Sequence, residues 1–197
     1  MDDPRHSAFW QERYERGKPG WDKGQAAPPL VRALAETKPD AGFKALVPGC
    51  GYGHEALYLA RLGFAVVAAD FASAPISDLA ERAAGLSLTA LQCDLFNLPA
   101  QFTAHFDLVV EHTCFCAIPV ERRGEYAETM AEVLGVGGQF LGLFWEMGEE
   151  DGPPFSTSQR DIRDFFSPYF EIADIAKPVD SFPGREGEEW LVRMDKR

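Results

Sequence analysis

The stretch that decides the fold is Val47-Pro48-Gly49-Cys50-Gly51-Tyr52-Gly53-His54-Glu55. It follows a short apolar run at 44–47 and opens an amphipathic segment at 56–62. This order predicts a strand, a tight turn and a helix. Glycines let the backbone come close to a ligand, and the start of a helix offers unpaired N–H groups and the positive end of its dipole. The stretch therefore indicates a ligand-binding loop.

Asp70 makes a nucleoside the first candidate ligand. A second apolar run, 65–69, ends at this acid. A carboxylate at the end of the second strand is an acceptor for the two hydroxyls of a ribose, at the spacing typical of nucleoside-binding α/β units. A glycine loop alone is weak evidence, whereas loop and acid together favour nucleoside binding.

The pattern of the loop separates two classes of nucleoside. Dinucleotide sites use G-x-G-x-x-G, whose third glycine packs the helix against the strand. Here the glycines are Gly49, Gly51 and Gly53, and His54 takes the place of that third glycine. Without a pyrophosphate to wrap, the loop suits a ligand whose amino-acid end crosses it. We therefore favour S-adenosylmethionine over NAD.

The rest of the chain alternates between strand-like and helix-like segments, which predicts a doubly wound α/β fold with a mainly parallel, seven-stranded, Rossmann-like sheet in one domain, 1–197. The last two strands follow one another through 180–185, which predicts a closing hairpin with one antiparallel strand at the end of the sheet. Gly63, Gly85 and Gly135 are expected to end helices as left-handed caps. The expected strands are 44–49, 65–70, 88–93, 106–112, 138–145, 170–177 and 188–194, and the expected helices are 54–62, 74–84, 120–134 and 158–167.

Residues 1–29 lie outside this alternation and are rich in aromatic residues, glycine and proline, with Trp10 and Trp21 among them. Two interpretations are open. The rings either fasten the terminus to the domain or form a lid over a bound ligand.

Two later strand ends supply further candidates. Asp94 and Leu95 follow the third strand, where an acid can accept from an adenine amino group while its neighbour packs on the ring. Taken alone, Asp94 would be read as the start of a turn. His112 ends the fourth strand, where the reacting group is expected. It is either a catalytic base or a polar wall of the cofactor pocket, and we favour the wall, because soft nucleophiles ionise easily.

Charge and cysteine usage narrow the function. The chain has 31 acidic and 19 basic residues, which disfavours nucleic acid as a partner. The four cysteines show no metal-ligand spacing, so no metal site is predicted, and we expect reduced, buried thiols in a cytoplasmic protein. No apolar run is long enough to cross a membrane. The segment 151–155, Asp-Gly-Pro-Pro-Phe, is interpreted as a turn whose Phe155 lines the substrate pocket.

At this point the chain resembles the thiopurine, thiol and halide/thiocyanate S-adenosylmethionine-dependent methyltransferases. The resemblance spans nearly the whole chain and rests on stretches in register, namely Trp21-Asp22-x-Gly24, 45–55 around Val-Pro-Gly-Cys-Gly, Asp70, Cys93-Asp94-Leu95-Phe96, Phe106-Asp107-Leu108-Val109, 115–123 beginning Phe-Cys-Ala-Ile, Gly137-Gly138 and Gly152-Pro153-Pro154-Phe155.

This resemblance implies a role for each candidate. Trp10 and Trp21 would contact the methionine end of the cofactor, above a loop formed by Gly49 and Gly51. Asp70 would hold the ribose, and Asp94 with Leu95 the adenine. His112 would stand where plant relatives carry a tyrosine.

The sequence thus predicts transfer of a methyl group from S-adenosylmethionine to a small soft nucleophile, most simply a thiol. A halide, thiocyanate or tellurite-type anion is the alternative acceptor. A non-catalytic cofactor-binding module is the alternative of a different class, and it would have its acceptor pocket filled.

Overall fold

The computed structural model describes residues 3–17, 19–148 and 152–197. Seven strands form one sheet in the order β3-β2-β1-β4-β5-β7-β6. The strands are β1 (Lys44–Pro48), β2 (Ala65–Asp70), β3 (Leu88–Gln92), β4 (Phe106–His112), β5 (Leu134–Trp145), β6 (Phe170–Ala176) and β7 (Glu189–Lys196). The helices are α1 (Ser7–Glu15), α2 (Pro28–Leu34), α3 (His54–Leu62), α4 (Ser73–Arg82), α5 (Arg123–Val133) and α6 (Gln159–Phe166), with short 3-10 turns η1 (Leu95–Asn97), η2 (Ala100–Phe102), η3 (Phe115–Ala117) and η4 (Val120–Arg122).

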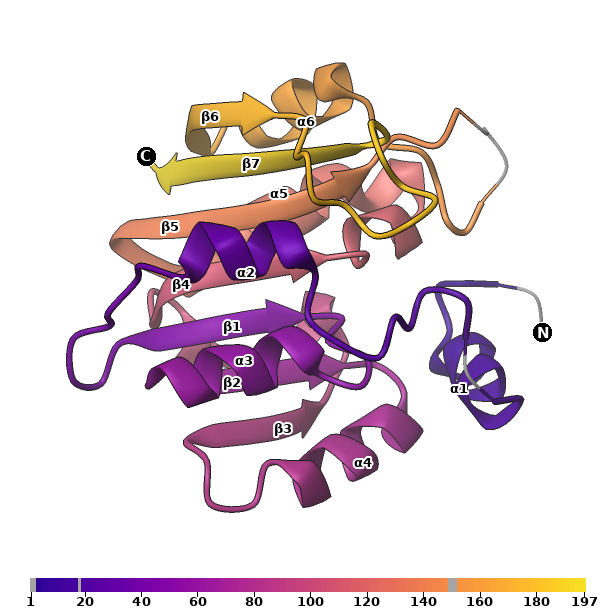
Figure 1. Cartoon of the computed structure of the whole chain (residues 1–197), viewed down its shortest axis with the longest axis vertical. Helices are drawn as coiled ribbons and strands as arrows, with labels where there is room; N and C mark the ends of the chain where they lie inside the picture. Colours follow the sequence, from indigo (N-terminus) through magenta and orange to yellow (C-terminus); the bar gives the residue numbers. More distant parts are fainter. Residues whose placement is uncertain (1–2, 18, 149–151) are drawn as a thin grey trace.

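The sheet lies between two helical layers, as the alternation predicted. In Figure 1, α2 and α3 cross one face while α5 and α6 lie behind the other. Leu57 and Leu59 of α3 belong to one apolar core, and Met130 of α5 and Phe166 of α6 belong to the second. The central strands β1 and β2 are buried over almost their whole length, as expected for parallel strands covered on both faces.

The strand order reverses between β1 and β4, which are parallel neighbours, with Leu46 paired with Val109. Because the chain turns to opposite sides after these two strands, their carboxyl ends open a crevice where ligands of such sheets bind. The loop after β1 and the end of β4 at His112 both lie at this edge.

The sequence correctly predicted a hairpin with one antiparallel strand, but it wrongly placed that strand at the end of the sheet. It is β7, which lies inside the sheet and pairs antiparallel with both β5 and β6. Val192 and Met194 of β7 are buried, whereas β6 exposes polar side chains such as Glu171. A polar strand suits the edge of the sheet, so β6 is outermost.

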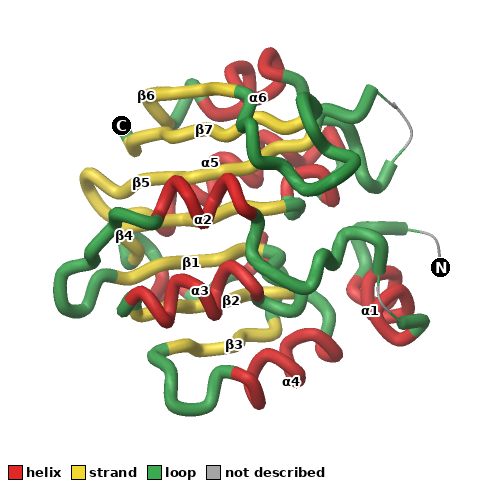
Figure 2. Tube along the Cα trace, in the orientation of Figure 1, coloured by secondary structure: helices red, strands yellow, loops and turns green. Residues whose placement is uncertain are grey.

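Two helices and one helix end differ from expectation. α1 and α2 were not predicted, although α2 begins with Pro28 and Pro29, which fit the first turn of a helix. Gly63 caps α3 in the left-handed conformation, as predicted. Gly135 does not cap α5, because the chain is already extended at Leu134, which pairs with Phe106 in the sheet. Figure 2 shows α1 beyond the carboxyl ends of the strands rather than on a face of the sheet.

Candidate functional site

A cavity of about 420 Å³ opens at the carboxyl edge of the sheet. All eight residues predicted to hold the cofactor line it, namely Trp10, Trp21, Gly49, Gly51, Asp70, Asp94, Leu95 and His112. They come from the N-terminal segment and from the ends of four strands, so the fold brings together residues that are far apart in the sequence.

The glycine loop forms the floor of the cavity and requires its glycines. Gly49 and Gly51 have φ of +54° and +51°, a left-handed conformation that side chains disfavour. A Cβ on Gly49 would lie 2.5 Å from Sγ of Cys114, and one on Gly51 would lie 2.9 Å from the hydroxyl of Tyr14. The loop is therefore packed closely against the turn that follows β4 and against the N-terminal segment.

Asp70 is buried at the end of β2 and faces the cavity. Its Oδ2 accepts the backbone N–H of Gly51 and its Oδ1 accepts that of Ala72, both at 2.8 Å. Burial raises the pKa of Asp70, and these N–H groups only partly offset that effect. Each carboxylate oxygen has a further lone pair, so the acid still has capacity to accept a hydroxyl.

Asp94 both begins a turn and lines the cavity. Its side chain accepts the backbone N–H of Phe96 at 3.0 Å and caps η1. Leu95 is buried beside it. The two interpretations of Asp94 are therefore compatible, because the turn fixes the carboxylate at the wall of the cavity.

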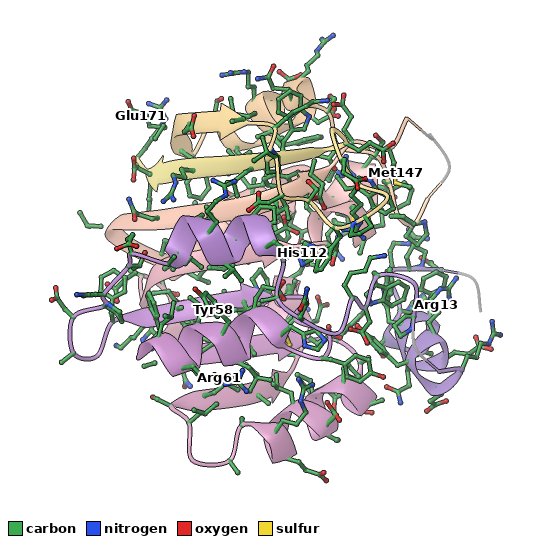
Figure 3. The ribbon with its side chains drawn as sticks, in the orientation of Figure 1. Arg13, Tyr58, Arg61, His112, Met147 and Glu171 are labelled. Carbon is green, nitrogen blue, oxygen red and sulfur yellow. The ribbon has the colours of Figure 1, made fainter. Side chains whose placement is uncertain are left out.

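The N-terminal segment covers the cavity with aromatic rings that pack edge-on against one another. Trp21 packs edge-on against both Trp10 and Tyr14, with ring centroids 5.7 Å apart in each pair. The indole of Trp10 donates to the carbonyl of Pro4 at 2.8 Å. Figure 3 labels Arg13 on α1, beyond the strand ends near which His112 is labelled. Tyr14, which was not among the predicted cofactor-binding residues, places its hydroxyl where a Cβ on Gly51 would point.

A hydrogen-bonded pair of side chains attaches this segment to the body of the protein. Oδ1 of Asp22 lies 2.8 Å from Nε2 of His54, the first residue of α3. Nδ1 of His54 lies 3.5 Å from Nη2 of Arg82 on α4. His54, which stands where a dinucleotide-binding loop carries glycine, thus anchors the covering segment.

His112 is held by a partner that the sequence did not reveal. Its Nδ1 lies 2.8 Å from Oε1 of Glu55, on the first turn of α3. Its ring stacks on Phe182, and its Nε2 is buried without a hydrogen-bond partner. Burial works against the protonated form, but the charge and hydrogen bond of Glu55 outweigh it and raise the pKa of His112.

Beyond His112, the cavity is lined by groups from the second half of the sheet. They are Cys116, Trp145, Pro153, Pro154 and Arg185. Arg185 is buried, its Nη1 donates to Oε1 of Glu189 at 3.3 Å, and its guanidinium lies 4.2 Å from the ring centroid of Trp145. These residues line the same cavity as the residues predicted to hold the cofactor.

The interpretation of the segment 151–155 was only partly correct. Pro153 and Pro154 line the cavity, but Phe155 does not. Phe155 is instead held by its backbone, which donates to the carbonyl of Cys116 at 2.7 Å and accepts from Arg123 at 3.0 Å. Asp151, which began the predicted turn, lies outside the described residues.

The end of β4 is shaped by a buried acid and a strained residue. Oε1 of Glu111 accepts the backbone N–H groups of Cys114 and Phe115 at 2.7 and 2.8 Å. Burial raises the pKa of Glu111 to about 7. Thr113, which lines the cavity, has φ of +60°, an uncommon conformation for a β-branched residue. Glu111 thus fixes the turn that brings Cys116 to the cavity.

The four cysteines are free thiols, and Cys93 is half-buried rather than buried as expected. Burial raises the pKa of Cys116 to about 12 and that of Cys114 well above its ordinary value. Because the thiolate is the reactive form, neither side chain is suited to act as a nucleophile.

Within the described ranges, no group of three or more His, Cys, Asp or Glu side chains is placed to hold a metal ion. Across the same residues, no helix is both long and apolar enough to traverse a bilayer.

Comparison with known proteins identifies the fold and the family. Residues 5–196 match the thiopurine S-methyltransferase (TPMT) family. Thiocyanate methyltransferase 1 of Brassica oleracea is 30% identical over 95% of this chain and 84% of its own length. Thiopurine S-methyltransferase of Pseudomonas aeruginosa (strain UCBPP-PA14) is 27% identical over 86% of this chain and 85% of its own length.

Among solved structures, a Burkholderia thailandensis 1,6-didemethyltoxoflavin-N1-methyltransferase with bound S-adenosylhomocysteine superposes with a TM-score of 0.76, over 96% of this chain and 86% of that one, at 19% identity. That likeness shows a class I, Rossmann-like methyltransferase fold. Together with the family match over almost the whole chain, it leads to one conclusion: this protein belongs to the thiopurine S-methyltransferase family and is an S-adenosylmethionine-dependent methyltransferase.

Proposed function

We propose that this enzyme methylates the sulfur of a small thiol, and that His112 accepts the proton of that thiol. The proposal rests on the hydrogen bonding of the two nitrogens of the His112 ring. One nitrogen is bound to Glu55, and the other is buried, unpartnered and at the wall of the cavity. The sequence favoured a passive role for His112, and the contact with Glu55 supports a catalytic one.

The Glu55 contact decides which nitrogen of neutral His112 is basic. An ionised carboxylate only accepts hydrogen bonds, so Nδ1 must carry the hydrogen that it donates to Glu55. Neutral His112 then has its lone pair on Nε2, the atom without a partner. When Nε2 takes a proton, the imidazolium that forms is stabilised by Glu55, because an opposite charge at this distance favours the charged form.

The cofactor occupies the opposite end of the cavity in this proposal. Trp10 and Trp21 cover it, and Gly49 and Gly51 lie beneath its amino-acid end. Asp70 accepts from the ribose hydroxyls, and Asp94 with Leu95 contacts the adenine. S-adenosylmethionine supplies the activated methyl group. The remaining tasks of the chain are to exclude water, align the acceptor sulfur and remove its proton.

The charge of the acceptor end supports a nucleophile that reacts as an anion. Protonated His112 and buried Arg185 are both cationic groups that line this end of the cavity, although each is paired with a carboxylate, Glu55 and Glu189 respectively. A thiol whose proton has moved to Nε2 becomes a thiolate, which is the reactive form of sulfur. The new bond would join the acceptor sulfur to the methyl carbon while the bond from that carbon to the sulfonium sulfur breaks, which leaves S-adenosylhomocysteine; the proton remains on His112 until water removes it.

A second candidate acceptor is an anion such as thiocyanate, iodide or tellurite. The buried guanidinium of Arg185 favours it, because Arg185 is positively charged whatever the state of His112. Such an acceptor brings no proton, so it does not need neutral His112 as a base, and the protonated ring attracts it more strongly than the neutral ring does.

The test is to measure S-adenosylhomocysteine formation with a panel of thiols, iodide, thiocyanate and tellurite. We expect kcat/KM to be highest for a thiol. Turnover of the anions alone would overturn the thiol assignment, and binding of S-adenosylmethionine without turnover of any acceptor on the panel would favour the binding-module alternative.

A further inference from the structure

Oε1 of Glu55 accepts two hydrogen bonds from distant parts of the chain. The backbone N–H of Ala27 donates to it at 3.0 Å, and Nδ1 of His112 lies 2.8 Å away. Glu55 itself is buried on α3. One atom therefore joins the N-terminal segment to the candidate base.

Ala27 is the point at which the covering segment enters the body of the protein. It is fully buried, it directly precedes α2, and it follows the cavity-lining residues Gly20 to Asp22, Lys23 and Gln25. Its backbone N–H group reaches a side-chain acceptor 28 residues away. Movement of the segment away from the cavity would therefore disturb the Ala27–Glu55 bond.

The charged groups that face His112 come from three elements. Glu55 on α3 and Glu111 on β4 favour the imidazolium, whereas Arg185, between β6 and β7, disfavours it. Of these groups, only Glu55 bonds to the ring. Changes in the surroundings of Glu55 therefore act directly on His112.

We propose that Glu55 is a positioning residue that couples the seating of the N-terminal segment to the protonation of His112. This rests on the proposed role of His112 as the base. With Ala27 in place, the carboxylate is shielded from water and attracts the imidazolium strongly. When Ala27 leaves, water screens the carboxylate and the attraction weakens.

The coupling acts in both directions, since linked equilibria are reciprocal. If seating of Ala27 favours the imidazolium, protonation of His112 by the thiol must equally favour the seated segment. The segment is then held most firmly while the methyl group is transferred. Loss of the proton to water loosens the segment when the product must leave.

The experiment uses the full chain saturated with S-adenosylhomocysteine and two measurements. The first is an NMR titration of His112, and the second is amide hydrogen exchange of residues 20–27 as a function of pH, corrected for intrinsic exchange. In the unaltered protein, we expect protection of 20–27 to fall as pH rises, with the same midpoint as the titration of His112.

Two variants separate the two bonds. Glu55→Gln should lower the titration midpoint of His112 by about 1–3 pH units and abolish the pH dependence of exchange. Ala27→Pro replaces the donating N–H with a ring methylene that faces Glu55, at a φ of −63° that proline adopts, so it should unseat the segment and also lower the midpoint. Ala27→Gly, which keeps the N–H, is its matched control and should leave the midpoint near that of the unaltered protein.

The proposal is overturned if Ala27→Pro and Ala27→Gly give the same midpoint, or if exchange of 20–27 does not depend on pH. If Ala27→Pro does not fold, the exchange profile of Glu55→Gln decides. Neither measurement requires a methyl acceptor. Failure of thiol turnover with intact coupling would therefore count against the proposed function alone.

Discussion

Asp70 bonds to the glycine loop that it faces: its Oδ2 accepts the backbone N–H of Gly51 at 2.8 Å. The residue expected to hold the ribose therefore also fixes the loop expected to lie beneath the amino-acid end of the same cofactor. A substitution at Asp70 should affect both, and the experiment must separate ligand contact from loop support.

Asp70→Ala should weaken binding of S-adenosylhomocysteine at least about tenfold, because a hydrogen bond to a charged group contributes on the order of 1.5–3 kcal/mol. Calorimetry measures the affinity. Asp107→Ala is the matched control, since the Asp107 carboxylate also accepts a backbone N–H, that of Lys44 at 2.8 Å, but does not line the cavity. It should lower stability and leave affinity intact. Equal losses of affinity in both variants would show that Asp70 acts through folding alone.

Gly51→Ala should weaken cofactor binding by more than its backbone strain explains. The left-handed conformation costs alanine about 1–2 kcal/mol, and the new methyl group also meets the hydroxyl of Tyr14 at 2.9 Å. Gly85→Ala carries similar strain at φ +82°, with no atom within 4 Å, and controls for it. Adding Tyr14→Phe to Gly51→Ala should restore part of the affinity. No recovery would mean that Tyr14 does not press on the loop.

The two acceptor classes should show opposite pH profiles. Because Glu55 raises the pKa of His112, the ring stays protonated to a pH above its ordinary value of about 6.5. As pH rises through this raised pKa, neutral His112 forms. For a thiol of high pKa, kcat/KM should rise in that window, whereas for thiocyanate it should fall.

His112→Tyr should then cost about 10²–10⁴ in rate for thiols of high pKa and much less for an acceptor that is already ionised. The measurement is kcat/KM across a series of thiols of differing pKa. A small loss of kcat/KM that is the same for all thiols would show that His112 only lines the pocket.

Asp22→Ala should speed the release of S-adenosylhomocysteine about tenfold, since it removes the charge-assisted hydrogen bond to His54 that attaches the covering segment. Stopped-flow displacement measures the rate. Glu12→Ala provides a control within the same segment, because Glu12 pairs with Arg16 at the exposed surface of α1. Such surface pairs contribute little, so its release rate should not change. Equal rates in the two variants would mean that the segment merely fastens the terminus.

The cofactor end of the site could be predicted from the sequence because its residues lie in or beside single motifs. Gly49 and Gly51 follow one apolar run, and Asp70 ends the next. In parallel strands, these positions must meet at one edge of the sheet. For these residues, the sequence motif alone is enough to predict where they lie in the folded protein.

The acceptor end could not be predicted in the same way. Glu55 and His112 are 57 residues apart, and their contact depends on β4 lying beside β1. Arg185 reaches the cavity only because β7 lies inside the sheet, where an outermost position was expected. Tyr14 belongs to α1, whose apolar residues form no clear stripe. In each case the contact depends on strand order or on packing that no local signal encodes.

The position of β7 has a consequence for how this enzyme could diversify. Because β7 runs against its neighbours, the connection from β6 returns to the edge of the sheet that carries the reaction, bringing Phe182 and Arg185 with it. The glycine loop and Asp70 come from the other half of the sheet. If the site is divided as proposed, we expect mutations in the β6–β7 connection to change which nucleophile is accepted while the half of the sheet proposed to hold the donor stays constant. This connection is the natural segment to exchange or randomise in order to alter the acceptor range.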